Sequence, residues 1–384
     1  MAASLPGGGA PSALPRFANL DKLRGFAALS VVLYHVIEIT GWSTYPVSGP
    51  LVWGRIGWMG VDLFFVISGL VITYSAWTLQ ARYGERWRRE FWRRRWMRIA
   101  PLYFFTILVF MCFIQPEWLA APFKHLGKHL LAHALFIHNL FPATHGSIDG
   151  ANWSIGVEMQ FYLVIALSLP WLVRARTWVV LAVLFAIGLG WRALAFGWIG
   201  ADDPGRMFHT TTQLPGTLDQ FAFGILLCKI MVDQRHAALA SWLRRHPLPV
   251  MAAAVMLIVV MWLVFWRYSG NYWDNVWMIV FFRPLLGAAA GALILIAMVW
   301  PWRVWRWLAA PFDYLGVISY GLYLWHLPVI LSLQRTGLPT GVSFLLTTVA
   351  GTTLFAAVSW HLFEKRWMQG AHAAAARATV APSA

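Results

Sequence analysis

The sequence predicts an all-α protein, a polytopic integral membrane bundle of about ten transmembrane helices with both termini cytoplasmic. The first observation behind this prediction is composition, because 59% of the 384 residues are hydrophobic and only 12% are charged, whereas soluble domains are about 25% charged. The second is a series of apolar runs long enough to cross a bilayer. The third is the uneven distribution of Lys and Arg between those runs.

Ten segments have the length and apolar character of a membrane span, which needs about 17–25 residues. The apolar stretch 125–141 is shorter and carries several histidines, so we expect an interfacial or re-entrant helix there. The longest connection, 116–152, leaves no room for a soluble domain. The expected spans are 25–41, 56–79, 99–115, 153–173, 178–199, 216–232, 249–267, 276–299, 312–333 and 341–362.

The distribution of basic residues predicts the orientation. With the N-terminus inside, most of the 30 Lys and Arg residues fall in inner connections, as is typical of cytoplasmic loops. The densest run, 82–98, interleaves Arg with Trp, which is typical of an interfacial helix on anionic headgroups. Topology therefore accounts for the net charge of +15, and we expect no nucleic-acid partner.

The two ends of the chain are predicted to be flexible tails around one membrane domain at 19–367. Residues 1–18 lack the basic start and apolar core of a secretory signal, and 368–384 are rich in Ala. The two cysteines, Cys112 and Cys228, lie in apolar runs. They support neither a disulfide framework nor a cysteine metal site.

Ionisable side chains inside spans are costly, so each is a candidate for function. At a rise of about 1.5 Å per residue, six of them on six helices fall in the outer third of the bilayer. The alternative is a set of buried ion pairs that hold the bundle together, because structural pairs also perturb ionisable groups. The six residues are His35, Asp62, Glu158, Asp219, Arg283 and His326.

His35 is the best candidate for a catalytic base, because neutral imidazole can accept a proton near pH 7. We expect a carboxylate from another helix, Asp62 or Glu158, to hold its ring. Glu38 is one turn away, but it projects alongside His35 on the same helix. A covalent intermediate on His35 is the alternative mechanism.

Arg24 precedes His35 by eleven residues, so both project from one helix face about 16 Å apart. A guanidinium suits phosphate. One elongated ligand could contact both residues, and coenzyme A has this shape, with phosphates at one end and a thioester at the other. Arg95 and Arg98 share a helix face and could complete the phosphate site. The alternative for Arg24 is a simple anchor at the membrane boundary.

Five blocks of sequence, in order, resemble the membrane acyltransferase-3 family. The resemblance covers about residues 19–367, nearly the whole chain. The blocks are LDKLRGFAALSVVLYH (20–35), GVDLFFVISG (60–69), RRRWMRIAPLY (93–103), NWSIGVEMQFYL (152–163) and LGVISYGLYLWHLPVI (315–330).

The resemblance implies a multi-pass O-acyltransferase of the bacterial cytoplasmic membrane, among membrane lipids. It would move an acyl group, with acetyl expected, from cytoplasmic acyl-coenzyme A to a hydroxyl of a carbohydrate or lipid-linked glycan at the outer side. The donor would be a substrate, with no permanently bound cofactor. The implied site residues are catalytic His35, Asp62 and Glu158, donor-binding Arg24, Arg95 and Arg98, and substrate-binding Trp153, Tyr162 and His326.

The chain departs from the family pattern at a few positions. Lys22 stands where many members have Gly, and Gly156 and Met159 replace the usual Ser and second Glu. The first Glu, Glu158, is retained. Many members carry an additional esterase-like domain after the last span. We expect none here, so transfer would be completed in the bundle or on a separate protein.

Two other classes of protein fit parts of the sequence. A transporter also buries charges, but the chain has no internal repeat and no corresponding pair of interrupted spans. A lipid-binding structural protein would not need Arg24 and His35 on one face. His125, His129 and His133 have the spacing of metal ligands, but no carboxylate accompanies them within the helix, and we expect no metal.

Overall fold

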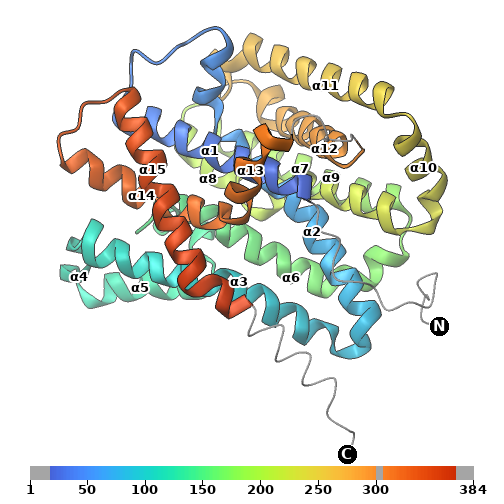
Figure 1. Cartoon of the computed structure of the whole chain (residues 1–384), viewed down its shortest axis with the longest axis horizontal. Helices are drawn as coiled ribbons and strands as arrows, with labels where there is room; N and C mark the ends of the chain where they lie inside the picture. The colour runs from blue at the N-terminus through green and yellow to red at the C-terminus, as the bar shows by residue number, and fades with distance from the viewer. Residues whose placement is uncertain (1–17, 300–305, 369–384) are drawn as a thin grey trace, which may run out of the picture.

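The computed structural model describes residues 18–299 and 306–368. Every regular element within these ranges is helical, so the predicted all-α class is confirmed (Figure 1). The tails expected at 1–18 and 368–384 lie outside the described residues, apart from Ala18 and Met368. The α-helices are α1 (Ala18–Thr40), α2 (Met59–Tyr83), α3 (Trp87–Val109), α4 (Glu117–Ala120), α5 (Phe123–Ala134), α6 (Trp153–Arg174), α7 (Thr177–Ile199), α8 (Pro204–Thr211), α9 (Leu214–Val232), α10 (Ala237–Arg245), α11 (Pro247–Tyr268), α12 (Arg283–Val299), α13 (Arg306–Val317), α14 (Ser319–Arg335) and α15 (Val342–Ser359).

The described residues contain eight helices long and apolar enough to cross a membrane, or up to nine if the bent pair α13–α14 is one span. The expected number of ten is therefore not confirmed. One reason is that Met59–Ile114 is a single helical stretch of 56 residues, which contains two of the expected spans. The chain turns within it at Gly84, whose φ of +52° suits glycine because glycine has no Cβ. The cytoplasmic position of the termini stays a prediction.

The expected span 312–333 is bent rather than straight. Residues Ala310–Val317 and Ser319–Arg335 are separate helical segments that meet at 77°. α13 packs against α1 at a very close approach, because a Cβ at Gly316 would meet the backbone of Asp21. The bend therefore lets α13 lie across α1 while α14 runs through the core.

The connection between α3 and α6 contains two short helices, α4 and α5, which lie together at one edge of the bundle (Figure 1). α5 has 12 residues, too few to cross a bilayer. The connection ends at Asp149, whose side chain accepts a hydrogen bond from the backbone N–H of Ala151. This cap starts the short helical turn η5 (Gly150–Asn152), which leads into α6.

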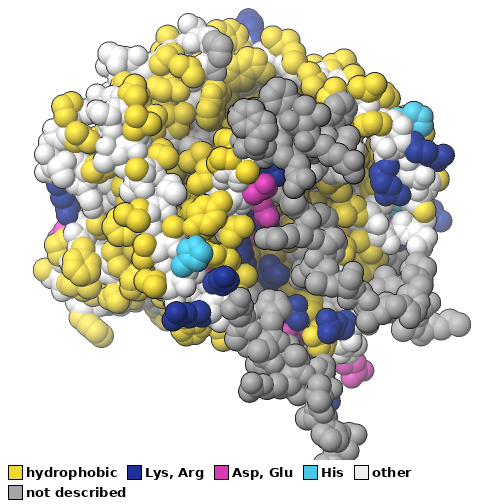
Figure 2. All heavy atoms as spheres, in the orientation of Figure 1, with side chains coloured by type: hydrophobic (Ala, Val, Ile, Leu, Met, Phe, Trp, Pro, Cys, Tyr) yellow, Lys and Arg dark blue, Asp and Glu magenta, His cyan; other side chains and the backbone are white. Residues whose placement is uncertain are grey.

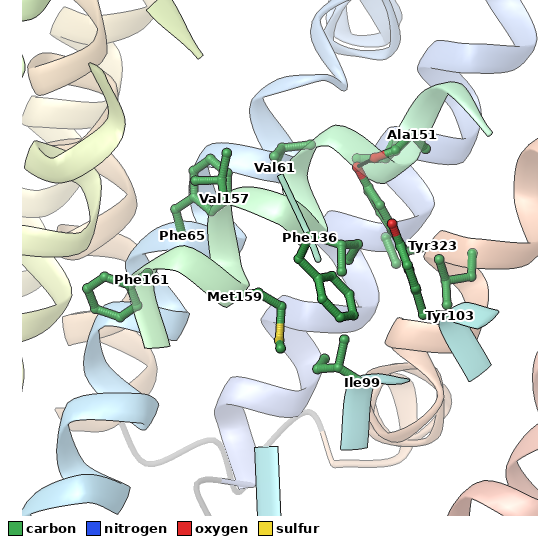
Figure 3. Packing of buried hydrophobic residues seen from close by; sticks show 14 of the residues in the cluster. Val61, Phe65, Ile99, Tyr103, Phe136, Ala151, Val157, Met159, Phe161 and Tyr323 are labelled. Atoms are coloured by element: carbon green, nitrogen blue, oxygen red, sulfur yellow. Dashed lines mark hydrogen bonds between the residues drawn. The ribbon is translucent and has the colours of Figure 1, made fainter. Parts of the chain in front are cut away.

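The core is built mainly from α1, α2, α3, α6, α9 and α14. Phe221 of α9 stacks on Phe161 at a ring separation of 3.9 Å and packs against Phe65 at 4.9 Å. Figure 3 shows Phe65 and Phe161 at one end of this cluster and Tyr323 near Ala151 at the other. The Tyr323 hydroxyl donates to the Ala151 carbonyl at 2.8 Å, which ties α14 to the start of α6.

The outside of the bundle is largely apolar, as a lipid-facing surface requires. In the face shown in Figure 2, hydrophobic side chains dominate, and Lys and Arg gather mainly in the lower middle and at the right. α11 is the most lipid-facing of the candidate spans, with 17% of its most apolar window buried. It runs along the edge of the bundle beside α12 (Figure 1).

Glycines allow α2 and α9 to pack at backbone contact. A Cβ added at Gly69 would lie 2.3 Å from the Phe221 carbonyl oxygen, and one at Gly224 would lie 2.1 Å from the Val66 carbonyl oxygen. Backbone cannot move aside as a flexible side chain can. The glycines therefore fix the separation of the two helices, and α2 carries residues of the site described below.

We therefore expect Gly69→Ala and Gly224→Ala each to destabilise the protein by about 1–3 kcal/mol, as overpacking does. The matched control is Gly190→Ala in α7, where a Cβ meets nothing within 4 Å. Because alanine is the better helix former by up to about 1 kcal/mol, the control should be neutral or stabilising. Thermal unfolding in detergent measures the difference. Equal midpoints for all three variants would contradict the close packing.

Candidate active site

Two cavities lie end to end inside the bundle. The arginine cavity, with a volume of about 80 Å³, is lined by residues that include Arg24, Arg95, Arg98, Glu158 and Tyr162. The histidine cavity, with a volume of about 490 Å³, is lined by residues that include His35, Asp62, Trp153, Phe208 and Arg283. Both are lined by Val61 and Tyr323, so these two side chains form the boundary between them.

The cavities follow each other along the helix axes. On α1, Arg24 lines the first cavity and His35 lines the second, about 16 Å further along. On α2 the order is reversed: Asp62 lines the histidine cavity and Ser68 the arginine cavity, about 9 Å apart along the helix. α6 has the same order as α2, because Trp153 lines the histidine cavity and Glu158, further along the helix, lines the arginine cavity. The two spaces therefore occupy different depths of the bundle.

The arginine cavity brings together the three arginines that the sequence singled out. Arg24 Nη1 lies 3.3 Å from Asp21 Oδ1, and Arg95 Nη2 donates to Ser75 Oγ at 3.1 Å. Arg95 Nε is buried without a hydrogen-bond partner among the described residues. Arg98 Nη1 contacts the sulfur of Met368 at 3.7 Å. Neither Arg95 nor Arg98 forms an ion pair with a described carboxylate, so both can accept an anionic ligand.

Glu158 lies in the arginine cavity rather than beside His35. Its Oε1 accepts hydrogen bonds from Ser68 Oγ at 2.9 Å and from Tyr162 Oη at 2.7 Å. Ser68 lies six residues beyond Asp62 on α2, about 9 Å deeper. Glu158 therefore lies level with Ser68 rather than with Asp62, the level that counting along the helices predicted.

His35 is held by another histidine rather than by a carboxylate. His35 Nδ1 lies 3.0 Å from the Val31 carbonyl oxygen and 3.1 Å from His326 Nε2. His326 Nδ1 faces the carbonyl oxygen of Tyr323 at 2.5 Å, so it carries the proton, and Nε2 is an acceptor in the neutral ring. His35 Nδ1 then carries its own proton toward these acceptors. The unprotonated atom of neutral His35 is therefore Nε2.

Asp62, the other carboxylate that was expected to orient His35, is also engaged elsewhere. Asp62 Oδ1 accepts from Arg283 Nη1 at 2.8 Å, and both side chains are almost fully buried. Asp219 makes a second buried pair with Arg192 at 2.5 Å. No described carboxylate is hydrogen-bonded to His35, and Glu38 is exposed. The structure thus places Asp62 in an ion pair on the wall of the histidine cavity.

The walls of the histidine cavity are mostly aromatic. Trp153 packs on Phe208 at 5.5 Å and stacks on His145 at 6.1 Å. Phe208 in turn meets Trp273 at 6.4 Å. The other aromatic residues of this lining are Tyr34, Trp58, Phe265, Tyr272 and Tyr323. A large aromatic space with a buried ion pair on one wall suits a ligand that has both apolar faces and hydroxyl groups.

The three predicted substrate-binding residues lie in different places. Trp153 lines the histidine cavity and Tyr162 lines the arginine cavity. His326 is completely buried and lies behind His35, in the lining of neither cavity. Arg88, one of the arginines assigned to lipid headgroups, donates to the Ala166 carbonyl at 2.9 Å and so joins α3 to α6.

Sequence reasoning missed Tyr323, which lies at the boundary of the two cavities. Its hydroxyl oxygen is 2.7 Å from Ser154 Oγ. Because Tyr323 donates its proton to Ala151, Ser154 is the donor in this second bond. The sequence signal that could have identified Tyr323 is its position three residues before His326, because residues three apart share a helix face.

A buried histidine pair in the connection between α3 and α6 was also missed. The rings of His133 and His138 stack at 4.1 Å and 9°, and Tyr103 Oη lies 2.7 Å from His133 Nδ1. His138 Nε2 donates to the Asn152 carbonyl at 2.9 Å. Burial lowers the pKa of His133 to about 3 and that of His138 to about 4. Two neutral imidazoles thus fasten this connection to α3 and to the start of α6.

Comparison with known proteins identifies the class. Residues 17–364 match the family model of the acyltransferase-3 acyltransferase domain. The chain belongs to this family, and it is a multi-pass integral membrane protein. Family membership favours the enzyme over the transporter. No solved structure matches the chain.

Three relatives illustrate the range of similarity. The chain is 25% identical to the peptidoglycan O-acetyltransferase OatA of Listeria monocytogenes over 341 residues, which cover 81% of this chain and 49% of that protein. It is 30% identical to the putative membrane-bound transacylase BcsY of Komagataeibacter xylinus, over segments that cover 81% of this chain and 72% of that protein. It is 26% identical to the putative peptidoglycan O-acetyltransferase YrhL of Bacillus subtilis, over segments that cover 90% of this chain and 54% of that protein. The chain thus spans about half the length of two of these relatives.

The neutral histidine pair predicts a stability that depends on pH. Because the folded pKa values of His133 and His138 lie below the ordinary value of 6.5, the unfolded chain binds more protons below that pH. Stability should be fully present above about pH 6.5 and should fall as the pH drops toward about 4. Thermal unfolding in detergent between about pH 7.5 and 5 measures the slope.

The variant His133→Gln removes one titrating ring and should flatten this slope. The control His246→Gln removes an exposed histidine and should leave the slope unchanged. If both variants keep the wild-type slope, the buried pair does not control acid stability.

Proposed function

We propose that the chain transfers an acyl group from acyl-coenzyme A, bound at the arginine cavity, to a hydroxyl of a glycan bound in the histidine cavity. One observation carries this proposal: a cavity lined by three arginines and a cavity lined by His35 share a boundary at Val61 and Tyr323. A donor with phosphates at one end and a thioester at the other fits this order.

The donor phosphates would contact Arg24, Arg95 and Arg98. The buried Nε of Arg95, which lacks a partner among the described residues, supports this assignment, because an unsatisfied buried donor is costly. The cavity volume of about 80 Å³ suits an extended arm rather than a nucleotide. The nucleotide would then remain at the entrance while the thioester carbonyl reaches the boundary at Tyr323.

His35 would act as the general base through Nε2. The acceptor hydroxyl gives its proton to Nε2 while its oxygen bonds to the thioester carbonyl carbon. The carbon–sulfur bond then breaks, and the proton passes from His35 to the departing thiolate. His326 would be a positioning residue, because its contact with Nδ1 keeps the proton off Nε2.

The orientation in the membrane follows from charge. The arginine cavity lies at the end of α1 near Arg24 and adjoins α3, which carries the densest basic run. An excess of Lys and Arg is typical of the cytoplasmic side. We therefore propose that the donor enters from the cytoplasm and that the histidine cavity faces the outer half of the bilayer.

The acceptor would be a glycan, and the transferred group acetyl. Two of the relatives carry names that describe peptidoglycan O-acetyltransferases. The aromatic walls at Trp153, Phe208 and Trp273 support a ligand made of sugar rings, since such rings present apolar faces together with hydroxyl groups. The hydroxyl to be acylated would point toward His35.

The donor assignment predicts that Arg24→Ala, Arg95→Ala and Arg98→Ala each raise the KM for acetyl-coenzyme A. Loss of one charge-assisted contact should cost about 10- to 150-fold, equivalent to about 1.5–3 kcal/mol. Arg86→Ala and Arg89→Ala are the controls, because both side chains are exposed. Release of free thiol at varied donor concentration measures KM. An equally small effect of all five variants would reject the donor site.

The base assignment predicts that His35→Ala and His35→Gln are equally inactive, because glutamine cannot accept the proton. Loss of a general base should reduce turnover by about 10²–10⁴-fold. His361→Gln, at an exposed histidine, should keep wild-type turnover. The measurement is transfer of labelled acetyl from acetyl-coenzyme A inside sealed vesicles to an oligosaccharide outside, with thermal unfolding as the folding control. Near-normal turnover of a folded His35→Ala variant would overturn the mechanism.

A further inference from the structure

The boundary between the two cavities carries one polar side chain. Of the residues that the structure describes, only Val61 and Tyr323 line both the arginine cavity and the histidine cavity. The side chain of Val61 is a hydrocarbon, and its backbone N–H already donates to the Trp58 carbonyl at 3.0 Å. Tyr323 is therefore the polar side chain that the two cavities share, and a ligand that extends from one into the other must pass it.

The hydroxyl of Tyr323 is held by two hydrogen bonds that can be exchanged by rotating hydroxyl protons alone. It donates to the Ala151 carbonyl at 2.8 Å (Figure 3) and accepts from Ser154 Oγ at 2.7 Å. Ser154 Oγ also lies 3.4 Å from the same Ala151 carbonyl oxygen. A hydroxyl hydrogen rotates to suit its partners. If Ser154 turns its proton to Ala151, the Tyr323 proton becomes available to a third acceptor and the carbonyl keeps a donor.

The same turn of α14 positions the proposed base. His326 follows Tyr323 by three residues, and its Nδ1 faces the Tyr323 carbonyl oxygen at 2.5 Å. The ring of His326 packs against Tyr323 at 5.6 Å and against His35 at 4.8 Å. The side chain at the boundary and the proposed base thus adjoin the same buried imidazole, and both adjoin the histidine cavity.

The proposed transfer creates a negative charge at this boundary. When the acceptor oxygen bonds to the thioester carbonyl carbon, one electron pair of the carbonyl bond moves onto the carbonyl oxygen, which becomes an oxyanion. Positioned hydrogen-bond donors stabilise such an oxygen, most of all where water is excluded. The cations of the histidine cavity are committed, because Arg283 is paired with Asp62 and His35 holds the proton of the acceptor. A neutral donor at the boundary is therefore needed.

We infer that Tyr323 is a further catalytic residue, whose hydroxyl donates a hydrogen bond to the oxyanion while Ser154 replaces it at the Ala151 carbonyl. This inference rests on the proposed function, because it places the thioester carbonyl at the boundary. Tyr323 keeps its proton throughout. As the intermediate collapses, the oxyanion electron pair re-forms the carbonyl bond, the carbon–sulfur bond breaks, and the proton on His35 Nε2 passes to the thiolate sulfur. The Tyr323 hydroxyl then returns to Ala151.

The first measurement is turnover of the full-length protein in lipid nanodiscs, as release of thiol from acetyl-coenzyme A with an N-acetylglucosamine oligosaccharide as acceptor. Tyr323→Phe should lower kcat by about 10²–10³-fold, as loss of an oxyanion donor does, with little change in the KM for acetyl-coenzyme A. The control is Tyr45→Phe, because the Tyr45 hydroxyl donates to the Leu51 carbonyl at 2.9 Å and Tyr45 lines neither cavity. An equal kcat for the two variants would overturn the inference.

Two donor analogues separate catalysis from the structural tie between α14 and α6. S-(2-oxopropyl)-coenzyme A carries a planar ketone, whereas its trifluoromethyl counterpart is hydrated in water, so that its carbon is tetrahedral like the intermediate. Tyr323→Phe should weaken binding of the trifluoromethyl analogue about tenfold, the effect of one lost hydrogen bond, and should spare the ketone. Arg98→Ala should weaken both equally, because they carry the same phosphates. Equal effects of Tyr323→Phe on the two analogues would reject the catalytic role.

Ser154→Ala tests the exchange of hydrogen bonds. Without Ser154 the Ala151 carbonyl has no replacement donor when Tyr323 turns away, so kcat should fall about tenfold. In the Tyr323→Phe background the same change should cause no further loss of kcat, because Ser154 acts through Tyr323. Losses that multiply would show that Ser154 acts independently and would reject the exchange.

A second variant covers the case in which Tyr323→Phe lowers the unfolding midpoint more than Tyr45→Phe does. A 3,5-difluorotyrosine in place of Tyr323 keeps the hydroxyl and its bond to Ala151. Its more acidic hydroxyl donates more strongly and should tighten binding of the trifluoromethyl analogue relative to the ketone. An unchanged ratio of the two affinities, with wild-type turnover intact, would reject only the role of Tyr323. Wild-type protein that binds neither analogue and releases no thiol would reject the proposed function itself.

Discussion

The low dielectric of the membrane requires that buried charges be compensated, and the whole site depends on where that requirement is met. Asp62 with Arg283 and Arg192 with Asp219 form buried pairs at 2.8 and 2.5 Å, so these four charges need no ligand. The arginine cavity differs, because its lining contains more guanidinium groups than carboxylates, and its one carboxylate is already bonded to neutral side chains. Positive charge without a full internal partner is what an anionic donor would neutralise.

The same constraint explains why a histidine, rather than a carboxylate, lies behind His35. A carboxylate there would place another charge beside the buried pairs and would cost desolvation energy unless His35 were protonated. The neutral ring of His326 satisfies Nδ1 of His35 without adding charge. In the proposed mechanism this arrangement leaves Nε2 unprotonated in the resting state, and the cation forms only while the proton is in transit.

Much of the fold could be predicted from the sequence, because apolar runs and basic loops are set by the bilayer itself. The rotation of each helix about its own axis could not be predicted, because depth counted along a helix does not say which neighbouring helix a side chain faces. Glu158 illustrates this: counting from Trp153 gave a shallow position, whereas the packing of α6 on α2 turns it toward Ser68. The bend between α13 and α14 and the pairing of Asp62 depend likewise on contacts between residues far apart in sequence. The arginine cluster was predictable because spacing along single helices already aligned Arg95 with Arg98.

The relative sizes of the two cavities bear on how an acyl group would cross the membrane. The arginine cavity is narrow and the histidine cavity is several times larger, so the bulky partner in the proposed reaction belongs on the histidine side. The nucleotide and phosphates, which are the parts most costly to desolvate, would then stay near the arginines at the end of the bundle. In the proposed reaction only the thioester end, which is small and uncharged, would pass Val61 and Tyr323. In the proposed reaction a short, neutral acyl group would therefore be the only part of the donor that has to leave one side of the membrane for the other, and the boundary between the cavities could remain closed to everything larger.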